Sequence, residues 1–396
     1  MIKSIANAEL EGKKVLVRSD FNIPIDPDGT IRSFTKINDS LPTIDLILKK
    51  GGIPILMSHL GRPKNATDPA FSLRPVADYF NAIGYHTIFV DDCIGPKVEE
   101  AVKNVQRDQI VFLENVRFYK EETEDDVEFA RKISKFGDIF CNNAFGTLHR
   151  AHATTDAIAL FFPKDKYAGL LVLKEVRILG KALSHPEHPF TAIIGGSKIT
   201  GKIDIIRNLF TKCDNILIGG GMMFTFFKAR GYEIGNSLVE TDKITLAREI
   251  MEEARANDIK FYLPTDVVEA DKFANDAFRR TVHRRDMDPN MMGLDIGEET
   301  IRTFSRVILT SKTVLWNGPM GVFEFPNFAR GTLALAHAMA KCTSNGGLTI
   351  VGGGDSARAI QQLNYENKIS HISTGGGASL EFLEGKVLPG IAALEC

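Results

Sequence analysis

The chain has 396 residues and a mass of 43.7 kDa, more than one compact hydrophobic core usually supports, so its length predicts two domains of about 150–200 residues each. With 44% apolar and 25% charged residues, its composition is typical of a soluble globular protein and excludes a disordered or fibrous one. The formal net charge of −2 and the pI near 6.5 argue against a general nucleic-acid-binding protein, which needs an excess of positive charge.

The sequence also argues against a membrane or secreted protein. Apolar runs such as Ala157–Phe162 reach about six residues, whereas a membrane-spanning helix needs roughly 20. The first ten residues contain a lysine but no apolar core behind it, unlike a secretory signal. We therefore expect a cytoplasmic protein that contacts no membrane. The cysteines are odd in number and far apart, which disfavours a disulfide framework or a zinc site; they are Cys93, Cys141, Cys213, Cys342 and Cys396.

Short β-rich runs alternate with longer amphipathic stretches along almost the whole chain. The strands expected in the first half are residues 15–18, 53–57, 87–90, 110–113 and 138–141. Those expected in the second half are residues 191–194, 215–218, 260–263, 313–316, 348–351 and 370–373. Helical patterns such as residues 241–257 lie between them. This alternation predicts an α/β fold with two doubly wound, Rossmann-like domains, each built on a mainly parallel sheet.

A domain boundary is expected near residues 165–190. Residues 167–183 have helical spacing, and they lead into the proline-marked segment 184–189 before the next strand. A helix that joins two α/β domains would explain both features. We therefore expect a first domain over residues 1–168, an interdomain helix over 169–185 and a second domain over 186–388.

Glycine clusters follow four predicted strands of the second half. Glycine lets the backbone turn sharply and approach a ligand, and a following helix offers unpaired N–H groups to an anion. A single glycine pair is often plain turn chemistry, but four junctions at the same edge of a parallel sheet indicate a phosphate-bearing ligand, most simply a nucleotide. The junctions are Gly195–Gly196, Gly219–Gly221, Gly352–Gly354 and Gly375–Gly377.

The first junction continues into a segment close to a phosphate-binding loop, residues 196–203. It ends in Ile203, where that loop needs a hydroxyl for Mg²⁺, so a true P-loop is a poor interpretation. Lys198 and Lys202 are four residues apart, which predicts that they share one face of a helix's opening turn. They fit either a solvated surface pair or a phosphate contact, and the glycines beside them favour phosphate. Asp355 fits a helix N-cap and a Mg²⁺ ligand equally well.

Cationic and imidazole side chains follow the predicted strands of the first half. Such loops gather at the carboxyl edge of one sheet, and arginine there suits bidentate capture of carboxylate or phosphate. The first domain is therefore predicted to bind a small, multiply anionic substrate. The side chains are Arg18, which precedes Asp20 and Asn22, and His59, Arg62, Arg117, His149, Arg150 and His152.

Two other segments carry weaker signals. His185 and His188 are flanked by prolines that spoil helical presentation, so we expect no metal site there. The basic run 279–285 is expected to be a solvated loop.

A nucleotide domain and an anion domain together predict a phosphotransferase. Transfer from ATP needs in-line positioning, Mg²⁺ and cationic groups more than covalent chemistry. An acceptor carboxylate is already ionised at neutral pH and requires no catalytic base, which agrees with the lack of a base motif in the sequence.

Seven segments carry a resemblance to a known family. They are residues 15–24 (VLVRSDFNIP), 58–63 (SHLGRP), 113–118 (LENVRF), 144–152 (AFGTLHRAH), 316–324 (WNGPMGVFE), 352–356 (GGGDS) and 370–382 (SHISTGGGASLEF). In this order the chain resembles the phosphoglycerate kinase family over almost its whole length. The resemblance implies a monomeric, hinge-bending, glycolytic enzyme that moves a phosphoryl group reversibly between 1,3-bisphosphoglycerate and MgADP, or from MgATP to 3-phosphoglycerate. Its cofactor would be Mg²⁺ with ATP or ADP, and it would have no nucleic-acid or membrane partner.

The resemblance also implies roles for individual residues. Phosphoglycerate would contact Arg18, Asp20, Phe21, Asn22, Lys36, His59, Leu60, Gly61, Arg62, Arg117, His149 and Arg150. Nucleotide would contact Lys198, Lys202, Gly293, Glu324, Gly353, Gly354, Asp355, Ser356 and Ala357, with Glu324 at the ribose and Asp355 serving the metal. Catalysis would fall to Lys36, Lys198, Gly375 and Gly376. Residues 389–396 would pack back on the first domain.

Three positions depart from the family pattern. Lys36 stands where the family has an arginine that steadies the transition state, Asn143 replaces an aspartate, and Gly201 replaces an acidic residue. Lysine keeps the charge but loses the planar fork of arginine. Because Lys198 and Asp355 are retained, we expect an active enzyme that Lys36 can slow. The alternatives are a degenerate nucleotide-binding paralogue with weak or no turnover, and a kinase for another acyl-phosphate or sugar acceptor.

Overall fold

The computed structural model describes residues 2–64 and 67–395. The chain divides into two compact units: unit 1 comprises Met1–Arg177 and Val387–Cys396, and unit 2 comprises Ile178–Lys386. The division falls inside helix α5 (Leu170–Ser184). Within the described residues, no helix has both the length and the apolar character needed to cross a bilayer.

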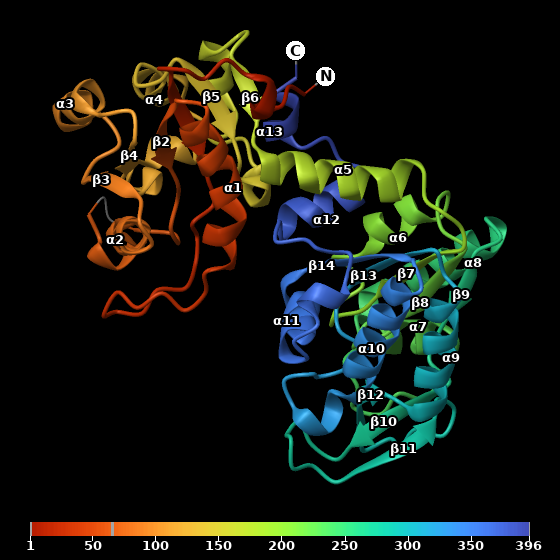
Figure 1. The fold of residues 1–396 in the computed structure, drawn as a ribbon. Coiled ribbons are helices and arrows are strands. Elements are labelled where there is room, and N and C mark those ends of the chain that lie inside the picture. The colour runs from red at the N-terminus through yellow and green to blue at the C-terminus, as the bar shows by residue number, and fades with distance from the viewer. Residues whose placement is uncertain (1, 65–66, 396) are drawn as a thin grey trace. The chain divides into compact units, whose positions relative to one another are not determined.

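Unit 1 is built on a six-stranded sheet in the order β3-β4-β2-β1-β5-β6, and every neighbouring pair is parallel (Figure 1). The strands are β1 (Lys14–Arg18), β2 (Ile53–Met57), β3 (His86–Val90), β4 (Gln109–Leu113), β5 (Ile139–Asn142) and β6 (Lys166–Ala168). The central strands are buried along almost their whole length, which is why they read as continuous apolar runs in the sequence. Tyr167, which the sequence assigned to a helix, belongs to β6.

Helices cover the sheet of unit 1. Their apolar residues recur at helical spacing, as Val76, Ala77 and Phe80 do in α2, and these side chains complete a core with Val17, Leu56 and other strand residues. The helices are α1 (Thr35–Lys49), α2 (Arg74–Ala82), α3 (Pro96–Asn104), α4 (Val127–Ser134) and α13 (Pro389–Ala392), with 3-10 helices η1 (Ile5–Asn7), η2 (Pro69–Phe71), η3 (Val116–Phe118), η4 (Lys120–Glu122), η5 (Phe145–Thr147) and η6 (Ala157–Phe161).

Both ends of the described chain pack in unit 1. Ile2 and Glu395 form an antiparallel bridge. The amide of Gly390 donates to the carbonyl of Leu148 at 2.9 Å, and Lys166 Nζ donates to the carbonyl of Ala393 at 2.7 Å. The segment from Val387 onward is thus part of the same compact unit as β1.

Unit 2 contains a second parallel sheet, in the order β15-β14-β13-β7-β8-β9, and a smaller antiparallel sheet in the order β11-β10-β12 (Figure 1). The parallel strands are β7 (Phe190–Ile194), β8 (Asn215–Ile218), β9 (Lys260–Tyr262), β13 (Thr313–Asn317), β14 (Leu348–Gly352) and β15 (His371–Ile372). The antiparallel strands are β10 (Asp266–Ala270), β11 (Arg279–His283) and β12 (Met292–Ile296). The helices are α6 (Ile203–Leu209), α7 (Met223–Ala229), α8 (Ile244–Ala256), α9 (Glu298–Leu309), α10 (Arg330–Ser344), α11 (Gly354–Gln362) and α12 (Gly377–Leu383), with 3-10 helices η7 (Thr241–Lys243), η8 (Pro326–Phe328) and η9 (Glu366–Lys368).

The predicted α/β class with two parallel sheets is confirmed, but the antiparallel sheet was not predicted. The prediction that the basic run 279–285 forms a solvated loop is wrong, because residues 279–283 form the exposed edge strand β11. Arg280 there is paired with Glu269 of β10 at 2.8 Å. Charged side chains on an edge strand discourage pairing with other chains, so an edge strand need not look apolar in sequence.

All the cysteines that the structure describes are buried. Cys93, Cys141, Cys213 and Cys342 are free thiols inside the two units. They lie singly on or beside buried elements, and these four form no disulfide with one another; Cys396 lies outside the described residues.

Candidate active site

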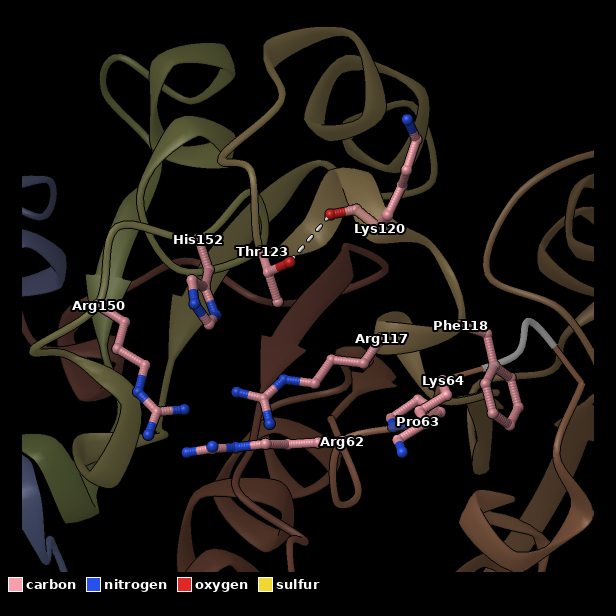
Figure 2. A pocket seen from close by; sticks show the side chains of 9 residues that line it. All are labelled: Arg62, Pro63, Lys64, Arg117, Phe118, Lys120, Thr123, Arg150 and His152. Carbon is pink, nitrogen blue, oxygen red and sulfur yellow. Dashed lines mark hydrogen bonds between the residues drawn. The ribbon is translucent and has the colours of Figure 1, made fainter.

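A cationic pocket lies at the carboxyl edge of the unit 1 sheet. Arg62 follows β2, Arg117 follows β4 and Arg150 follows β5, and Figure 2 shows their guanidinium groups pointing toward one space. Loops after parallel strands meet at one edge, which is why residues so far apart in sequence converge here. The cavity measures about 530 Å³ and is lined by Arg62, Pro63, Lys64, Arg117, Phe118, Lys120, Thr123, Arg150 and His152.

The loop after β1 is pinned beside this pocket by polar contacts. Lys36 Nζ, at the start of α1, lies 2.8 Å from Asp20 Oδ2. Asn22 accepts a hydrogen bond through Oδ1 from the Gly61 amide at 2.9 Å, and Arg117 donates to the Gly61 carbonyl at 2.7 Å. The Asn22 amide donates to Asp20 Oδ1 at 3.1 Å, so the structure brings these five predicted substrate residues together in one connected network.

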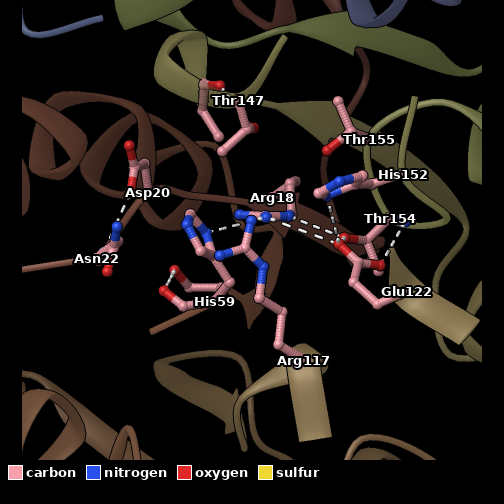
Figure 3. A network of polar contacts seen from close by, with 12 residues as sticks. Arg18, Asp20, Asn22, His59, Arg117, Glu122, Thr147, His152, Thr154 and Thr155 are labelled. Atoms are coloured by element: carbon pink, nitrogen blue, oxygen red, sulfur yellow. Dashed lines mark hydrogen bonds and ion pairs between the residues drawn. The ribbon is translucent and has the colours of Figure 1, made fainter. Parts of the chain in front are cut away.

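A buried ionic cluster lies next to the pocket (Figure 3). The guanidinium of Arg18 is 0% exposed; it donates through Nε to the Thr154 hydroxyl at 2.8 Å and lies 3.8 Å from Glu122. The carboxylate of Glu122 accepts from both the amide and the hydroxyl of Thr154, at 2.9 Å and 2.7 Å. His59 Nδ1 lies 3.3 Å from Arg18. Sequence reasoning missed Glu122 and Thr154, because nothing in their local pattern shows that the fold buries them against Arg18.

Burial and the positive charges of the cluster lower the pKa values of its basic side chains, whereas burial raises the pKa of Glu122. Burial and then Arg18 hold the pKa of His59 well below its usual value. Burial, followed by repulsion from Arg18 and Arg150, lowers the pKa of Arg117 to about 10. Burial and the nearby arginines lower the pKa of His152 to about 4. Both histidines are therefore neutral at physiological pH, whereas the arginines stay charged.

Some predicted substrate residues face away from the pocket. The rings of Phe21 and Phe112 stack in the hydrophobic core with centroids 5.4 Å apart, and the side chain of Leu60 is also buried. Phe21 and Leu60 therefore offer only backbone groups to a ligand. The ring of His149 accepts through Nε2 from Arg150 Nε at 3.2 Å, so it braces that arginine.

A second pocket, of about 500 Å³, lies in unit 2 where the loops after β7, β8 and β13 meet strand β12. Close backbone packing explains the glycines: a Cβ added to Gly220, which has a φ of +67°, would lie 2.5 Å from the amide nitrogen of Gly196. The lining residues are Gly196, Ser197, Gly220, Gly221, Met223, Phe224, Asn236, Leu238, Phe273, Met292, Gly293, Leu294, Pro319, Met320, Gly321, Val322, Glu324 and Asp355.

Three predicted nucleotide residues, Gly293, Glu324 and Asp355, line this pocket. Asp355 lies in the first turn of α11, with 57% of its side chain exposed and Arg358 3.7 Å away. The described residues contain no group of three or more side chains that could enclose a metal ion. Mg²⁺ takes only one or two oxygens from protein and most of its other ligands from phosphate and water, and the exposed carboxylate of Asp355 is the type of protein oxygen that it takes.

Lys202 and Asn317 form a second polar group at this sheet edge. Lys202 Nζ donates to Asn317 Oδ1, and burial lowers the pKa of Lys202 to about 8. The buried Nδ2 of Asn317 has no hydrogen-bond partner in the described part of the chain, and it lies 3.3 Å from where a Cβ on Gly353 would sit. Sequence reasoning gave Asn317 no role, although its motif was recognised.

The remaining residues of the predicted nucleotide site lie in the loops and first turns nearby. Gly354 opens α11, where an added Cβ would meet open space, and the Ala357 amide donates to the Gly353 carbonyl at 3.1 Å. Ser356 is buried, and its hydroxyl accepts from the Gly318 amide at 2.7 Å. Gly375 and Gly376, which were predicted to be catalytic, follow β15, and Gly376 caps α12 with a φ of +54°.

The predicted placement of Lys198 was wrong. Helix α6 begins at Ile203, and Lys202 is its N-cap, so Lys198 lies in the preceding loop and the two lysines do not share a helical turn as predicted. Glu240 holds that loop, because its carboxylate accepts from the Ile199 amide at 2.5 Å and from the Thr200 hydroxyl at 2.6 Å. The Lys198 side chain is exposed.

An arginine-lined pocket at the carboxyl edge of one parallel sheet and a glycine-lined pocket at the edge of another define a two-domain α/β transferase. A family model described as phosphoglycerate kinase matches residues 5–386. The chain belongs to the phosphoglycerate kinase family.

Individual relatives agree with this assignment. A phosphoglycerate kinase of Prosthecochloris aestuarii is 51% identical over 393 residues, covering 99% of each chain. Phosphoglycerate kinase 1, chloroplastic, of Arabidopsis thaliana is 49% identical, covering 100% of this chain and 82% of its own. The solved structure of phosphoglycerate kinase from Coxiella burnetii is 38% identical, with a TM-score of 0.91 over 100% of this chain and 99% of that one.

Proposed function

We propose that this chain catalyses reversible phosphoryl transfer between 1,3-bisphosphoglycerate and MgADP, and from MgATP to 3-phosphoglycerate, as a glycolytic enzyme. The observation that carries the proposal is the convergence of Arg62, Arg117 and Arg150 on one pocket in a chain of this family. Three guanidinium groups suit a small molecule that carries both phosphate and carboxylate, because each can make two parallel hydrogen bonds to such a group.

In unit 1 the proposed acid-binding site combines the three arginines with the loop after β1. Asn22 and Asp20 hold that loop against Gly61 and Lys36. His59 is neutral and serves as a hydrogen-bond donor or acceptor rather than as a charge. Phe21 and Leu60 contribute through their backbone only, because their side chains are in the core.

In unit 2 the proposed nucleotide site is the glycine-lined pocket. Apolar side chains such as Leu238 and Phe273 line it together with Gly293, and Glu324 is exposed at its edge, where it can bind a ribose hydroxyl. Amide groups and the helix dipole favour phosphate at the start of α11. The residues around this point are Lys202, Gly353, Gly354, Ser356 and Ala357. Asp355 would hold Mg²⁺, whose charge would offset that of the phosphates.

The chemistry requires positioning and charge neutralisation more than proton transfer. The acceptor carboxylate is ionised at neutral pH, so no side chain has to remove a proton from it. Lys36, Lys198 and the amides near Gly375 and Gly376 would stabilise the negative charge of the transferring phosphoryl group. Because that group must pass directly between the two substrates, we further propose that the units close on each other through a hinge.

We also propose a monomer that acts in the cytoplasm on small molecules, without nucleic-acid or membrane partners. The net charge of −2 supports the lack of a general nucleic-acid role.

The test is consumption of ATP in the presence of 3-phosphoglycerate and Mg²⁺, coupled to enzymatic reduction of the product. We expect turnover that depends on all three components and that Asp355→Asn reduces. An acceptor panel of other carboxylic acids and sugars is the specificity control. Nucleotide binding by calorimetry without turnover would instead identify a degenerate paralogue, and turnover with another acceptor alone would overturn the substrate assignment.

A further inference from the structure

The buried carboxylate of Glu122 has no part in the proposed mechanism, although it lies beside the arginines of the cationic pocket. It is 0% exposed and ends the short helix η4, which closely follows β4. Burying an ionised carboxylate is costly unless partners compensate it. Its partners are the amide and hydroxyl of Thr154 and the guanidinium of Arg18, with His152 4.0 Å away.

Arg18 is held by the same cluster on all sides. Its Nε donates to the Thr154 hydroxyl at 2.8 Å, and that hydroxyl in turn donates to Glu122. One terminal nitrogen donates to the Ser19 carbonyl at 2.5 Å. The other reaches His59 Nδ1 at 3.3 Å, and Figure 3 shows the guanidinium between His59 and Glu122. Because it is fully buried and occupied, Arg18 is placed to orient its neighbours rather than to contact a ligand.

The contact between Arg18 and His59 fixes where the imidazole carries its proton. A guanidinium only donates hydrogen bonds, so Nδ1 of His59 must accept and cannot carry a proton. The cations that face His59, namely Arg18, Arg117, Lys36 and Arg150, together with burial, keep the ring neutral. A neutral ring without a proton on Nδ1 has its proton on Nε2.

We propose that Glu122 and Arg18 are positioning residues: Glu122 anchors Arg18, and Arg18 fixes His59 as the tautomer whose Nε2–H donates to the anionic substrate. The inference rests on the proposed function, because it assigns His59 to the phosphoglycerate site. Apolar side chains of similar volume can often replace a buried ion pair without loss of stability. Positioning of His59 would explain why Arg18 and Glu122 are used here instead.

The first test needs no substrate. The wild-type protein is labelled with ¹⁵N-histidine, and the His59 signals are assigned by their loss in His59→Gln. We expect an unprotonated Nδ1 and a protonated Nε2 throughout the range of about pH 5–8. A proton on Nδ1, or a ring that titrates within this range, would overturn the proposal. Since no turnover is measured, this result stands or falls separately from the proposed function.

The second test removes both charges at once, in Arg18→Met/Glu122→Gln, so that neither partner is left as an orphaned buried charge. We expect the variant to fold, to lose the fixed tautomer of His59 and to raise the KM for 3-phosphoglycerate about tenfold. The KM for ATP should stay unchanged. Glu124→Gln, which alters an exposed carboxylate two residues away, is the matched control and should match the wild type.

A purely structural pair would give a different pattern. The double variant would then keep the wild-type His59 spectrum and the wild-type KM for both substrates, changing only the melting temperature. If the wild-type protein shows the expected tautomer but no turnover with 3-phosphoglycerate, the proposed function fails while the positioning of His59 by Arg18 stands.

Discussion

The pockets of unit 1 and unit 2 are lined by different kinds of chemical group. The unit 1 pocket is lined by charged side chains, three of them arginines, and a buried carboxylate lies behind them. The unit 2 pocket is lined mainly by backbone and apolar groups, together with the carboxylates of Glu324 and Asp355, and its glycines lie where one loop passes within atomic contact of another. A small substrate with two charged ends needs fixed cations, whereas a larger ligand with a planar base and a phosphate chain needs surface and amide groups.

The difference has an energetic consequence. Burial lowers the pKa values of Arg117 and His152, and repulsion from the neighbouring cations lowers them further. Unit 1 therefore requires a counter-charge that is present without substrate, and Glu122 supplies it. The unit 2 pocket concentrates little charge. Its requirement is instead for glycine, because its loops pack so closely that a side chain at these positions would collide with neighbouring backbone.

The largest expected effect separates the two pockets. Arg150→Met removes one guanidinium from the cationic pocket but leaves unit 2 untouched, so kcat/KM for 3-phosphoglycerate should fall about 100-fold, a typical cost of losing a charge-assisted contact. The KM for ATP should not change. Steady-state kinetics with each substrate varied in turn measure both values, and Arg107→Met, at an exposed arginine paired with Glu11, is the control. A parallel loss of ATP affinity would contradict the separation.

Lys202 is the point at which unit 2 also relies on a partly buried charge. Its pKa of about 8 means that it is charged below this pH and neutral above it. Affinity for ATP should therefore weaken as the pH rises through about 8, by up to about tenfold per pH unit. Calorimetric titration of ATP between about pH 6.5 and 9 measures the change. Lys202→Arg keeps its charge throughout this range, and an equally steep pH dependence in that variant would rule Lys202 out as the cause.

Lys36 tests whether the cations of unit 1 act by charge alone or by geometry. It lies 2.8 Å from Asp20 and has one donor group where arginine has a planar fork. Lys36→Arg should therefore raise kcat about fivefold, because two parallel hydrogen bonds to a phosphoryl group become possible. Lys13→Arg, at an exposed lysine, is the matched control. No increase in kcat would mean that this lysine does not limit the rate.

The smallest expected effect concerns stability rather than the pockets. Asn143 Oδ1 accepts from the Thr43 hydroxyl at 2.9 Å and from the Leu171 amide at 3.1 Å, while its buried Nδ2 has no hydrogen-bond partner among the described residues. Asn143→Asp replaces this orphaned donor with a second acceptor near the start of α5, which should add about 1 kcal/mol to the free energy of unfolding. Thermal melts at neutral pH measure it. A lower melting temperature would show that burial of the carboxylate outweighs the gain.

The sequence predicted those parts of the molecule that depend on local pattern. Strand β2 was predicted over its observed range, 53–57, because a buried parallel strand is a continuous apolar run. Arg62, Arg117 and Arg150 could be grouped because each follows such a strand. The carboxyl ends of parallel strands lie at one edge of a sheet, which brings the three loops together.

The features that sequence reasoning missed depend on tertiary contacts. Glu122 sits in an acidic segment that looks solvated, and only the fold shows that it is buried under Arg18. Asn317 ends a strand like many others, and its unpaired amide becomes visible only with Lys202 and Gly353 around it. Lys198 was placed on a helix because its four-residue spacing from Lys202 is typical of one helix face. The same spacing also occurs by chance in loops, and Lys198 lies in a loop.

The path of the chain through the two units bears on how the protein is made. Unit 2 is one uninterrupted stretch, Ile178–Lys386, whereas unit 1 needs the segment from Val387 onward, which packs against Leu148 and Lys166. On the ribosome, unit 2 has all its residues before unit 1 does, although unit 1 is started first. Unit 1, but not unit 2, is thus completed only when the segment from Val387 onward has emerged, and a nascent chain stalled before Val387 would have all the residues of unit 2 but not all those of unit 1.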